Sequence, residues 1–249
     1  MKNLSTRTTN LFSDCTRDKL LKNSLELFNR KGFVEVTTSL LASSAQVREG
    51  TLWYHFKSKK SLVESHIELF KTNIDLELET INKIDLENLI KKQFSNYYFN
   101  WDFRYLFRDN LLNYLSADKS ISNKLNSLTQ FRFNMIKKEA LIARDVGIFD
   151  FKENELDELS EIIFLVADNW FSLSAKRYPD KDESFLIQRG MGLLIKVSEP
   201  YLSKESKKIV KNFKLKVQVG GGIRTLEDIK NWVKNGVDKV IIGGKIIDA

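Results

Sequence analysis

Apolar residues recur at helical spacing through most of the chain, and the pattern changes near residue 213. Leu21, Leu25 and Phe28 share one face of a predicted helix, and a second apolar stripe runs through residues 159–170. After residue 213, "KVQVGGGI" and "VDKVIIGG" are β-branched runs on either side of "TLEDIKNWVKNG", which predicts a strand, helix, strand unit. The pattern therefore predicts an all-α protein with a short appended βαβ fragment.

Capping residues divide the helical part into elements. Gly32 is placed to end the first helix, Ser58 is a suitable N-cap for a long fourth helix, and Gly147 and Pro179 lie in connections. The predicted helices cover about residues 16–31, 38–45, 49–55, 59–80, 85–99, 103–116, 119–144, 153–177 and 182–200.

The positive charge lies at the two ends of the chain. Residues 1–70 hold eleven Lys and Arg against seven Asp and Glu, residues 71–213 hold 22 against 22, and residues 214–249 hold seven against four. A neutral middle indicates a localised basic site rather than a surface that binds polyanions everywhere.

Several classes of protein are disfavoured by composition. The longest apolar runs, such as "IIFLVA", are too short to span a bilayer, and the polar first fifteen residues lack the apolar core of a signal peptide, so we expect a cytoplasmic protein without a membrane partner. Cys15 is the only cysteine, so no intrachain disulfide can form. With only His55 and His66 beside it, we expect no structural zinc site, and no cofactor is indicated.

Residues 47–62, "VREGTLWYHFKSKKSL", combine aromatic side chains, a histidine and three lysines on a short predicted helix. Two short helices precede this one and a long helix follows it. That is the layout of a helix-turn-helix DNA-binding head, with the third helix as the one that reads DNA.

Residues 16 to about 63 resemble the N-terminal domain of the TetR family of bacterial transcriptional regulators. The matching motifs are "LFNRKGF" closing helix 1, "TT" opening helix 2, and "GTLWYHFKSKKSL" covering helix 3 and the start of helix 4. The resemblance implies a set of DNA-contacting residues: Thr37, Thr38, Arg48, Glu49, Thr51, Trp53, Tyr54, His55 and Lys59.

The side-chain chemistry agrees with this set. Thr37 or Thr38 can cap helix 2, and Gly50 allows a close approach to the groove. The hydroxyls of Thr51 and Tyr54 can reach phosphates or base edges, His55 can donate to a phosphate, and Lys59 can neutralise backbone charge. Leu52 and Phe56 are expected to face inward, against Leu41 and Leu25. Taken singly, each lysine fits a solvated surface charge and each aromatic fits a core position equally well.

Two residues depart from the family pattern. Gln46 stands in the turn where the family usually has glycine, which would strain or lengthen that turn. Glu49 places an acid on the recognition helix, where it would repel phosphates unless it accepts from a cytosine amino group.

The stretches "YLFRDNLLNYLSADKSISNKLNSLTQFRFNMIKKEALIARDVGIF" and "IIFLVADNWFSLSAKRYPD" resemble one subgroup's regulatory domain. By this resemblance, residues 64–213 form a helical domain that binds a small effector and dimerises through the last two helices, although their apolar stripe would also fit an intramolecular core. Aromatic side chains there either line an effector pocket or pack the core: Tyr97, Tyr98, Phe99, Trp101, Phe103, Tyr105, Phe107, Phe131, Phe133, Trp170 and Phe171. Residues 1–15 are expected to form a flexible arm and residues 16–63 the head.

Residues 214–249 resemble one strand, helix, strand unit of the HisA/HisF-like (β/α)8 barrels of histidine biosynthesis. The resemblance implies vestigial phosphate-binding positions at Gly221, Gly222, Gly243 and Gly244. So small a part of a barrel lacks the family's acid/base residues, so we interpret it as an appended fragment with two-strand pairing at best.

The sequence therefore predicts a homodimeric regulator, a DNA binder rather than an enzyme, that represses transcription at a pseudo-palindromic operator and responds to a small molecule. Two alternatives stay open. One is a phosphate-sugar isomerase, or its remnant, completed by strands from another chain, and the other is a regulator that has lost ligand control.

Overall fold

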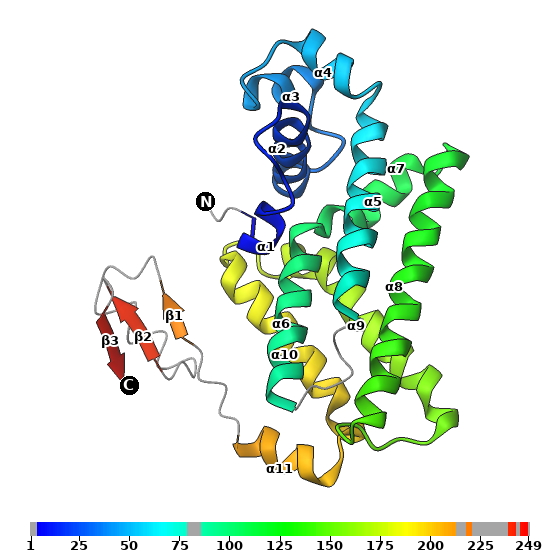
Figure 1. Cartoon of the computed structure of the whole chain (residues 1–249), viewed down its shortest axis with the longest axis vertical. Coiled ribbons are helices and arrows are strands. Elements are labelled where there is room, and N and C mark those ends of the chain that lie inside the picture. The colour runs from blue at the N-terminus through cyan, green and yellow to red at the C-terminus, as the bar shows by residue number, and fades with distance from the viewer. Residues whose placement is uncertain (1–3, 79–85, 213–217, 221–238, 243–244, 249) are drawn as a thin grey trace. The chain divides into compact units, whose positions relative to one another are not determined.

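The computed structural model describes residues 4–78, 86–212, 218–220, 239–242 and 245–248 (Figure 1). The chain divides into two compact units, Met1–Leu202 and Ser203–Ala249. The described part of the first unit is helical, with an isolated β-bridge between Phe149 and Leu202. None of the described helices is long and apolar enough to cross a membrane.

The N-terminal helices follow the predicted layout. They are α2 (Thr16–Lys31), α3 (Thr38–Ser44), α4 (Glu49–His55) and the long α5 (Lys59–Leu78), drawn in blue to cyan in Figure 1. Gly32 caps α2 with φ 87°, a left-handed conformation that glycine adopts without strain. Ser58 caps α5, because its hydroxyl accepts from the Ser61 amide at 3.2 Å. The predictions for all four helices are confirmed.

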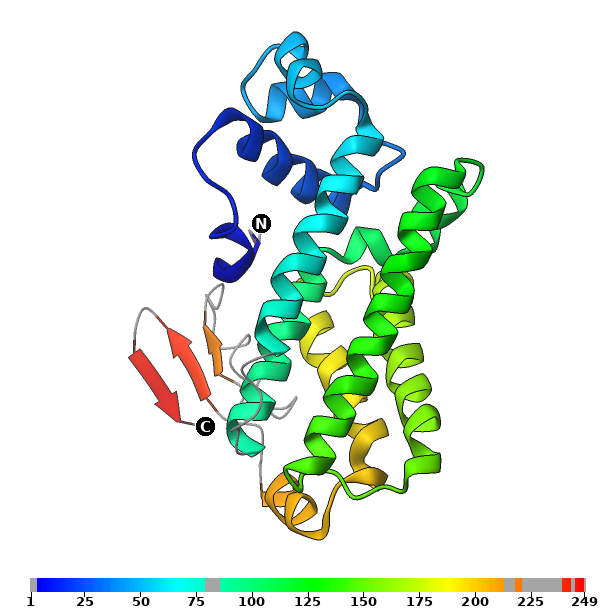
Figure 2. The same cartoon turned by 45° about the vertical axis from the view of Figure 1, so that its right-hand side comes forward.

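The remaining helices of the first unit form the body. They are α6 (Leu86–Asp102), the 3-10 turn η2 (Arg104–Phe107), α7 (Asp109–Leu115), α8 (Lys119–Asp145), η3 (Glu153–Glu155), α9 (Leu156–Arg177), α10 (Glu183–Ser198) and η4 (Glu199–Tyr201). Helix α9 packs against both α8 and α10, and α5 packs along α8 (Figure 2). Gly147 and Pro179 lie in connections, as predicted.

Two local predictions for this unit are wrong. The helix expected over 103–116 is broken, because Arg108 is extended (φ −89°, ψ 137°) and separates η2 from α7. The segment expected to be a flexible arm contains α1 (Thr6–Thr9), and the Ser5 amide before it donates to the Asp102 carboxylate at 2.9 Å. A capped turn and a partly buried hydrogen bond hold residues 5–9 against α6.

A hydrophobic core runs through the first unit, from α2 to α10. In the head its members include Leu25, Phe28 and Leu41. In the body it contains most of the aromatic residues that were candidates for an effector pocket: Tyr97, Phe99, Trp101, Phe103, Tyr105, Phe107, Trp170 and Phe171. Close ring contacts such as Phe70–Phe99, with centroids 5.5 Å apart, show that these side chains pack a core.

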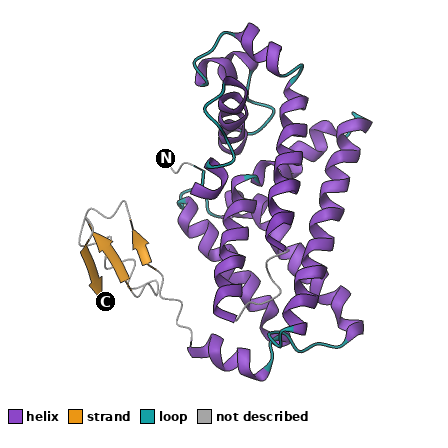
Figure 3. Ribbon diagram, in the orientation of Figure 1, coloured by secondary structure: helices purple, strands orange, loops and turns teal. Residues whose placement is uncertain are grey.

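The second unit contains α11 (Lys204–Asn212), which the sequence did not predict, and its described residues include three short strands, drawn in orange in Figure 3. Strand β1 (Gln218–Gly220) pairs in parallel with β2 (Lys239–Ile242), which pairs antiparallel with β3 (Lys245–Asp248). The two predicted strands are present, but a third strand, β3, pairs with β2 and corrects the expectation of two-strand pairing. The predicted helix between β1 and β2 and the glycines 221, 222, 243 and 244 lie outside the described residues.

Candidate DNA-binding head

Helices α3 and α4 pack against each other and are joined by a tight turn over residues 45–48. The Val47 amide donates to the Ala42 carbonyl at 2.9 Å, which closes the turn. Gln46 adopts φ 57°, and among the described residues no other non-glycine residue has positive φ. Of the two expected effects, strain or lengthening of the turn, the positive φ agrees with strain, since a side chain destabilises the left-handed region.

The inner face of α4 fixes it to the head. Leu52 is 2% exposed and Phe56 is 3% exposed, and both belong to the core cluster that contains Leu41 and Leu25. Because residues four apart share one helix face, this anchoring determines which side chains of α4 point outward. The predicted inward direction of both residues is confirmed.

The outer face of α4 presents aromatic and polar groups to solvent. Trp53 is 41% exposed and Tyr54 is 78% exposed, which is unusual for such large side chains. The Tyr54 ring contacts the His55 ring edge-on with centroids 5.1 Å apart. Arg48, Glu49 and Gly50 are exposed, and Thr51 and His55 are half-buried. Apart from Leu52, the residues of α4 and its N-cap Arg48 are therefore at least partly accessible, and we call this set the reading face: Arg48, Glu49, Gly50, Thr51, Trp53, Tyr54 and His55.

Thr37 and Thr38 differ in what they do at the start of α3. The Thr37 hydroxyl accepts from the Leu40 amide at 3.2 Å, so Thr37 is the N-cap. Thr38 is the first helical residue and is half-buried. Both residues therefore lie at the N-terminal end of α3, the helix that precedes α4.

The Lys59 side chain makes contacts within the head that the sequence did not suggest. Its ammonium group donates to the carbonyl oxygens of Phe33 at 2.6 Å and Val36 at 2.7 Å, and it lies 4.3 Å from the centre of the Phe33 ring. Burial lowers the pKa of Lys59, and only the charge of Glu35 opposes that shift. Lys59 therefore holds the loop between α2 and α3. These contacts use two of its three N–H groups, so its contact with DNA phosphate stays a prediction.

Two neighbouring lysines differ in their surroundings. Lys57 follows α4 directly and its side chain is exposed. Lys60 forms an ion pair with Asp118, the N-cap of α8, so its charge already has a partner. The family motifs did not place Lys57 among the DNA contacts, and its exposure beside the reading face adds it as a candidate.

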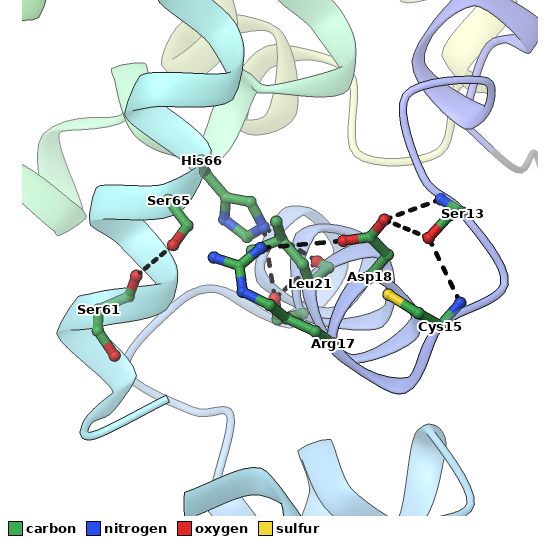
Figure 4. A network of polar contacts seen from close by, with 9 residues as sticks. Ser13, Cys15, Arg17, Asp18, Leu21, Ser61, Ser65 and His66 are labelled. Atoms are coloured by element: carbon green, nitrogen blue, oxygen red, sulfur yellow. Dashed lines mark hydrogen bonds and ion pairs between the residues drawn. The ribbon is translucent and has the colours of Figure 1, made fainter. Parts of the chain in front are cut away.

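His66 of α5 is fully buried, and its ring faces α2 (Figure 4). Its Nε2 donates to the Leu21 carbonyl at 3.0 Å, since a carbonyl can only accept. Its Nδ1 therefore accepts from the Tyr105 hydroxyl at 2.6 Å. These contacts give His66 a structural role within the core of the first unit.

The described residues contain no group of three His, Cys, Asp or Glu side chains that could hold a metal ion. Cys15 is exposed at the N-terminus of α2, where the Ser13 hydroxyl accepts from its amide at 3.4 Å (Figure 4).

Different parts of the chain are similar to different protein families. A family model described as histidine biosynthesis protein matches residues 199–249. Over 52 residues the chain is 36% identical to the biofilm operon icaADBC HTH-type negative transcriptional regulator IcaR of Staphylococcus aureus (strain Newman). That match covers 21% of this chain and 28% of the relative, so it spans less than a third of the relative's length.

Two solved structures share the helical fold. A TetR-family transcriptional regulator from Marinobacter aquaeolei VT8 is 27% identical with a TM-score of 0.66, and the match covers 80% of this chain and 96% of that one. A complex of SmeT with triclosan is 16% identical with a TM-score of 0.56 over 77% of this chain and 93% of that one, which shows a common fold.

Two family models match the first unit and its continuation into α11. The model of the regulatory proteins of the tetR family matches residues 20–65, and the model described as bacterial transcriptional repressor matches residues 69–210, more than half of the chain. With the buried and exposed faces of α4 described above, these matches identify the chain as a member of the TetR family of bacterial transcriptional regulators.

Proposed function

We propose that this regulator is a cytoplasmic homodimeric repressor whose α4 helices enter the major groove at a pseudo-palindromic operator. The observation that carries this proposal is that Leu52 of α4 and its C-cap Phe56 form a buried anchor, while Trp53 and Tyr54 of α4 are exposed. A short helix with one face fixed in the core and the other accessible has the geometry that groove reading requires.

We assign the DNA contacts to the reading face, with Thr37, Thr38 and Lys57 beside it. Arg48 and Lys57 supply positive charge, and Tyr54 and Thr51 supply hydroxyls. Phosphate contacts position the protein on DNA, while base-edge contacts specify the sequence. Glu49, at the first position of α4, reads a base because its charge repels phosphates.

Dimerisation is supported by the surface of α9. Leu165 is 59% exposed and Leu173 is 52% exposed, and residues eight apart in a helix are separated by about 80° around its axis, so both leucines lie on one side of α9. Helix α10 packs beside α9, and both are helices that the family resemblance assigns to the dimer interface. Two heads on one dimer would read half-sites about one helical turn of DNA apart.

We further propose that a small molecule controls DNA binding by favouring one of two conformations of the body. The complex of SmeT with triclosan, a protein of the same fold, is an example of ligand binding by such a structure. The buried aromatic residues of this chain already contact one another, so an effector would have to separate existing contacts or occupy another part of the body.

We assign no catalytic role to the second unit. Its similarity to histidine-biosynthesis proteins covers residues 199–249, which is a small part of a barrel of about 250 residues. A parallel pair of three- and four-residue strands with one antiparallel neighbour is not a closed barrel. We therefore propose that the chain acts by binding DNA and that the second unit is an appendage to the regulator.

A charge substitution beside the reading face tests the proposal. Lys57→Gln should lower the slope of log affinity against log salt by about 0.9 for each phosphate that the side chain no longer neutralises, or about twice that in a dimer. Lys138→Gln is the matched control, because Lys138 is a lysine on α8 in the body, away from the head. Equal slopes for both variants and the unchanged protein would contradict the proposed DNA-binding surface.

A further inference from the structure

Asn29 forms a buried joint between the head and the body. It lies two residues before the end of α2 and is 5% exposed. Its side-chain Nδ2 donates to the Asp102 carbonyl at 2.6 Å, and its Oδ1 accepts from the Tyr105 amide at 3.1 Å. The carbonyl belongs to the last residue of α6 and the amide to the second residue of η2, so the two groups lie on either side of the break at Phe103.

The chemistry of the joint requires a carboxamide. The break in helical hydrogen bonding leaves one carbonyl and one amide side by side, and Asn29 offers one donor and one acceptor to match them. The backbone carbonyl of Asn29 in turn accepts from Arg108 Nη1 at 3.0 Å. An aspartate at this position would keep the acceptor and lose the donor, and a leucine would lose both.

A second contact ties the same turn to α2. Tyr105 of η2 donates its hydroxyl to His66, and His66 donates to the Leu21 carbonyl of α2. Leu21 and Asn29 are eight residues apart, or about 12 Å along a helix. Attachment at two points that far apart fixes the direction of α2 relative to η2, where a single contact would allow rotation.

The turn η2 is also fixed to the body. The Phe107 ring contacts the Phe171 ring of α9, with centroids 5.4 Å apart. The Arg132 guanidinium of α8 lies 3.7 Å from the centre of the Phe107 ring and forms an ion pair with Asp168 of α9. Because α2 packs against α3 in the head, a shift of α9 has a continuous packed route to the head through η2 and Asn29.

We propose that Asn29 is a positioning residue that sets the angle between head and body and thereby determines which half-site spacing the dimer accepts. This inference rests on the proposed function. A rigid joint makes the protein reject operators whose half-sites are one base pair too close or too far, because the DNA would have to twist to fit. A loosened joint lets each head follow its own half-site, so the discrimination falls.

Selection from a library of random DNA duplexes, with the full-length protein, tests this because it does not require the operator to be known. The unchanged protein should select two half-sites at one spacing. Asn29→Asp and Asn29→Leu should select the same half-site sequence over several spacings, with the preference for the best spacing over a one-base-pair shift reduced about tenfold. Tyr105→Phe, which keeps the Asn29 contacts and removes the hydroxyl that binds His66, should broaden the spacing less.

Two controls separate positioning from stability. Asn23→Ala changes an asparagine of α2 whose side chain donates within its own helix, to the Lys19 carbonyl, and should leave the spacing preference unchanged. Met135→Ala opens a cavity in the body core and should lower stability without broadening the spacing. If Asn29→Leu does not fold, Asn29→Asp and Tyr105→Phe carry the test.

Failure of the inference about Asn29 and failure of the proposed DNA-binding function would give different results. Unchanged spacing in the Asn29 and Tyr105 variants, with only a lower affinity or melting temperature, would show that the joint is merely structural. If the unchanged protein selects no sequence at all, the proposed DNA-binding function fails and the inference about Asn29 falls with it.

Discussion

His66 accepts the hydroxyl hydrogen of Tyr105 at 2.6 Å inside the junction of α2, α5 and η2. The ring is fully buried, and burial lowers the pKa of His66 to about 4, with the hydrogen bond to the Leu21 carbonyl opposing the shift. The neutral imidazole is therefore part of the folded state, and protonation opposes folding.

Because His66 is buried in its neutral form, we expect the protein to lose stability as the pH falls. In the unfolded chain His66 takes up a proton near pH 6.5, its ordinary pKa, while in the folded protein it does so only near pH 4. The unfolded state thus binds more protons between these values, so the contribution of His66 is complete above pH 6.5 and is lost as the pH falls toward 4. The loss should approach about 3 kcal/mol.

Chemical denaturation at about pH 7 and about pH 5, with the unchanged protein and His66→Asn, measures this contribution. The unchanged protein should lose more stability between the two pH values than the variant, although the variant is less stable at neutral pH. Equal pH dependence in both proteins would show that His66 is not the group that titrates.

Replacing Lys59 should lower the stability of the protein, whereas replacing Lys57 should leave it almost unchanged. Lys59→Met removes an ammonium that holds the carbonyls of Phe33 and Val36 and should cost about 2 kcal/mol of unfolding free energy. Lys57→Met removes an exposed charge and should change stability by less than about 0.5 kcal/mol. Thermal melts of both variants check this, and a destabilised Lys57 variant beside an unaffected Lys59 variant would reverse the assignment.

The turn between α3 and α4 should become more stable with glycine. Gln46→Gly removes a side chain from a residue at φ 57° and should raise the unfolding free energy by about 1 kcal/mol. Gly147→Ala provides the reverse change, since Gly147 has φ 77° and open space around it, and should lower stability by a similar amount. Urea denaturation measures both, and a destabilised Gln46→Gly variant would mean that the glutamine side chain contributes contacts that outweigh the strain.

Gly190 of α10 should tolerate no side chain. A methyl group there would lie 1.8 Å from the Tyr97 hydroxyl and 2.6 Å from Trp170, so Gly190→Ala should cost about 1–3 kcal/mol. Gly192→Ala is the control on the same helix, where nothing lies within 4 Å. That variant should be neutral or slightly stabilised. A stability loss of equal size in both variants would point to a general effect on α10, in place of the specific overlap at Gly190.

The elements of the head could be predicted because their signals are local. The capping residues Gly32 and Ser58 and the four-residue spacing of Leu52 and Phe56 predicted the helix bounds and the inner face of α4, which the structure confirms. The break at Arg108 could not be predicted, because nothing in "RYLFRDN" resembles a glycine or proline stop signal.

The role of Lys59 could not be predicted either, because it depends on long-range geometry. Its partners, the carbonyls of Phe33 and Val36, are 26 and 23 residues away in the sequence. The direction of a backbone carbonyl cannot be inferred from the type of side chain at that residue. Asn29 is similar, since its partners are backbone groups more than seventy residues away. The pattern of side chains therefore predicts faces and caps, while contacts to distant backbone groups require the structure.

The most direct measurement of the central claim is the affinity of the full-length protein and of Tyr54→Ala for one selected operator and for a scrambled duplex. Tyr54 is 78% exposed on α4, so its replacement should leave the melting temperature unchanged. The unchanged protein should prefer the operator, and Tyr54→Ala should bind it about tenfold or more weakly while binding the scrambled duplex with a smaller loss. Equal affinity of the two proteins for the operator, or no preference for the operator in the unchanged protein, would contradict DNA reading by the exposed face of α4.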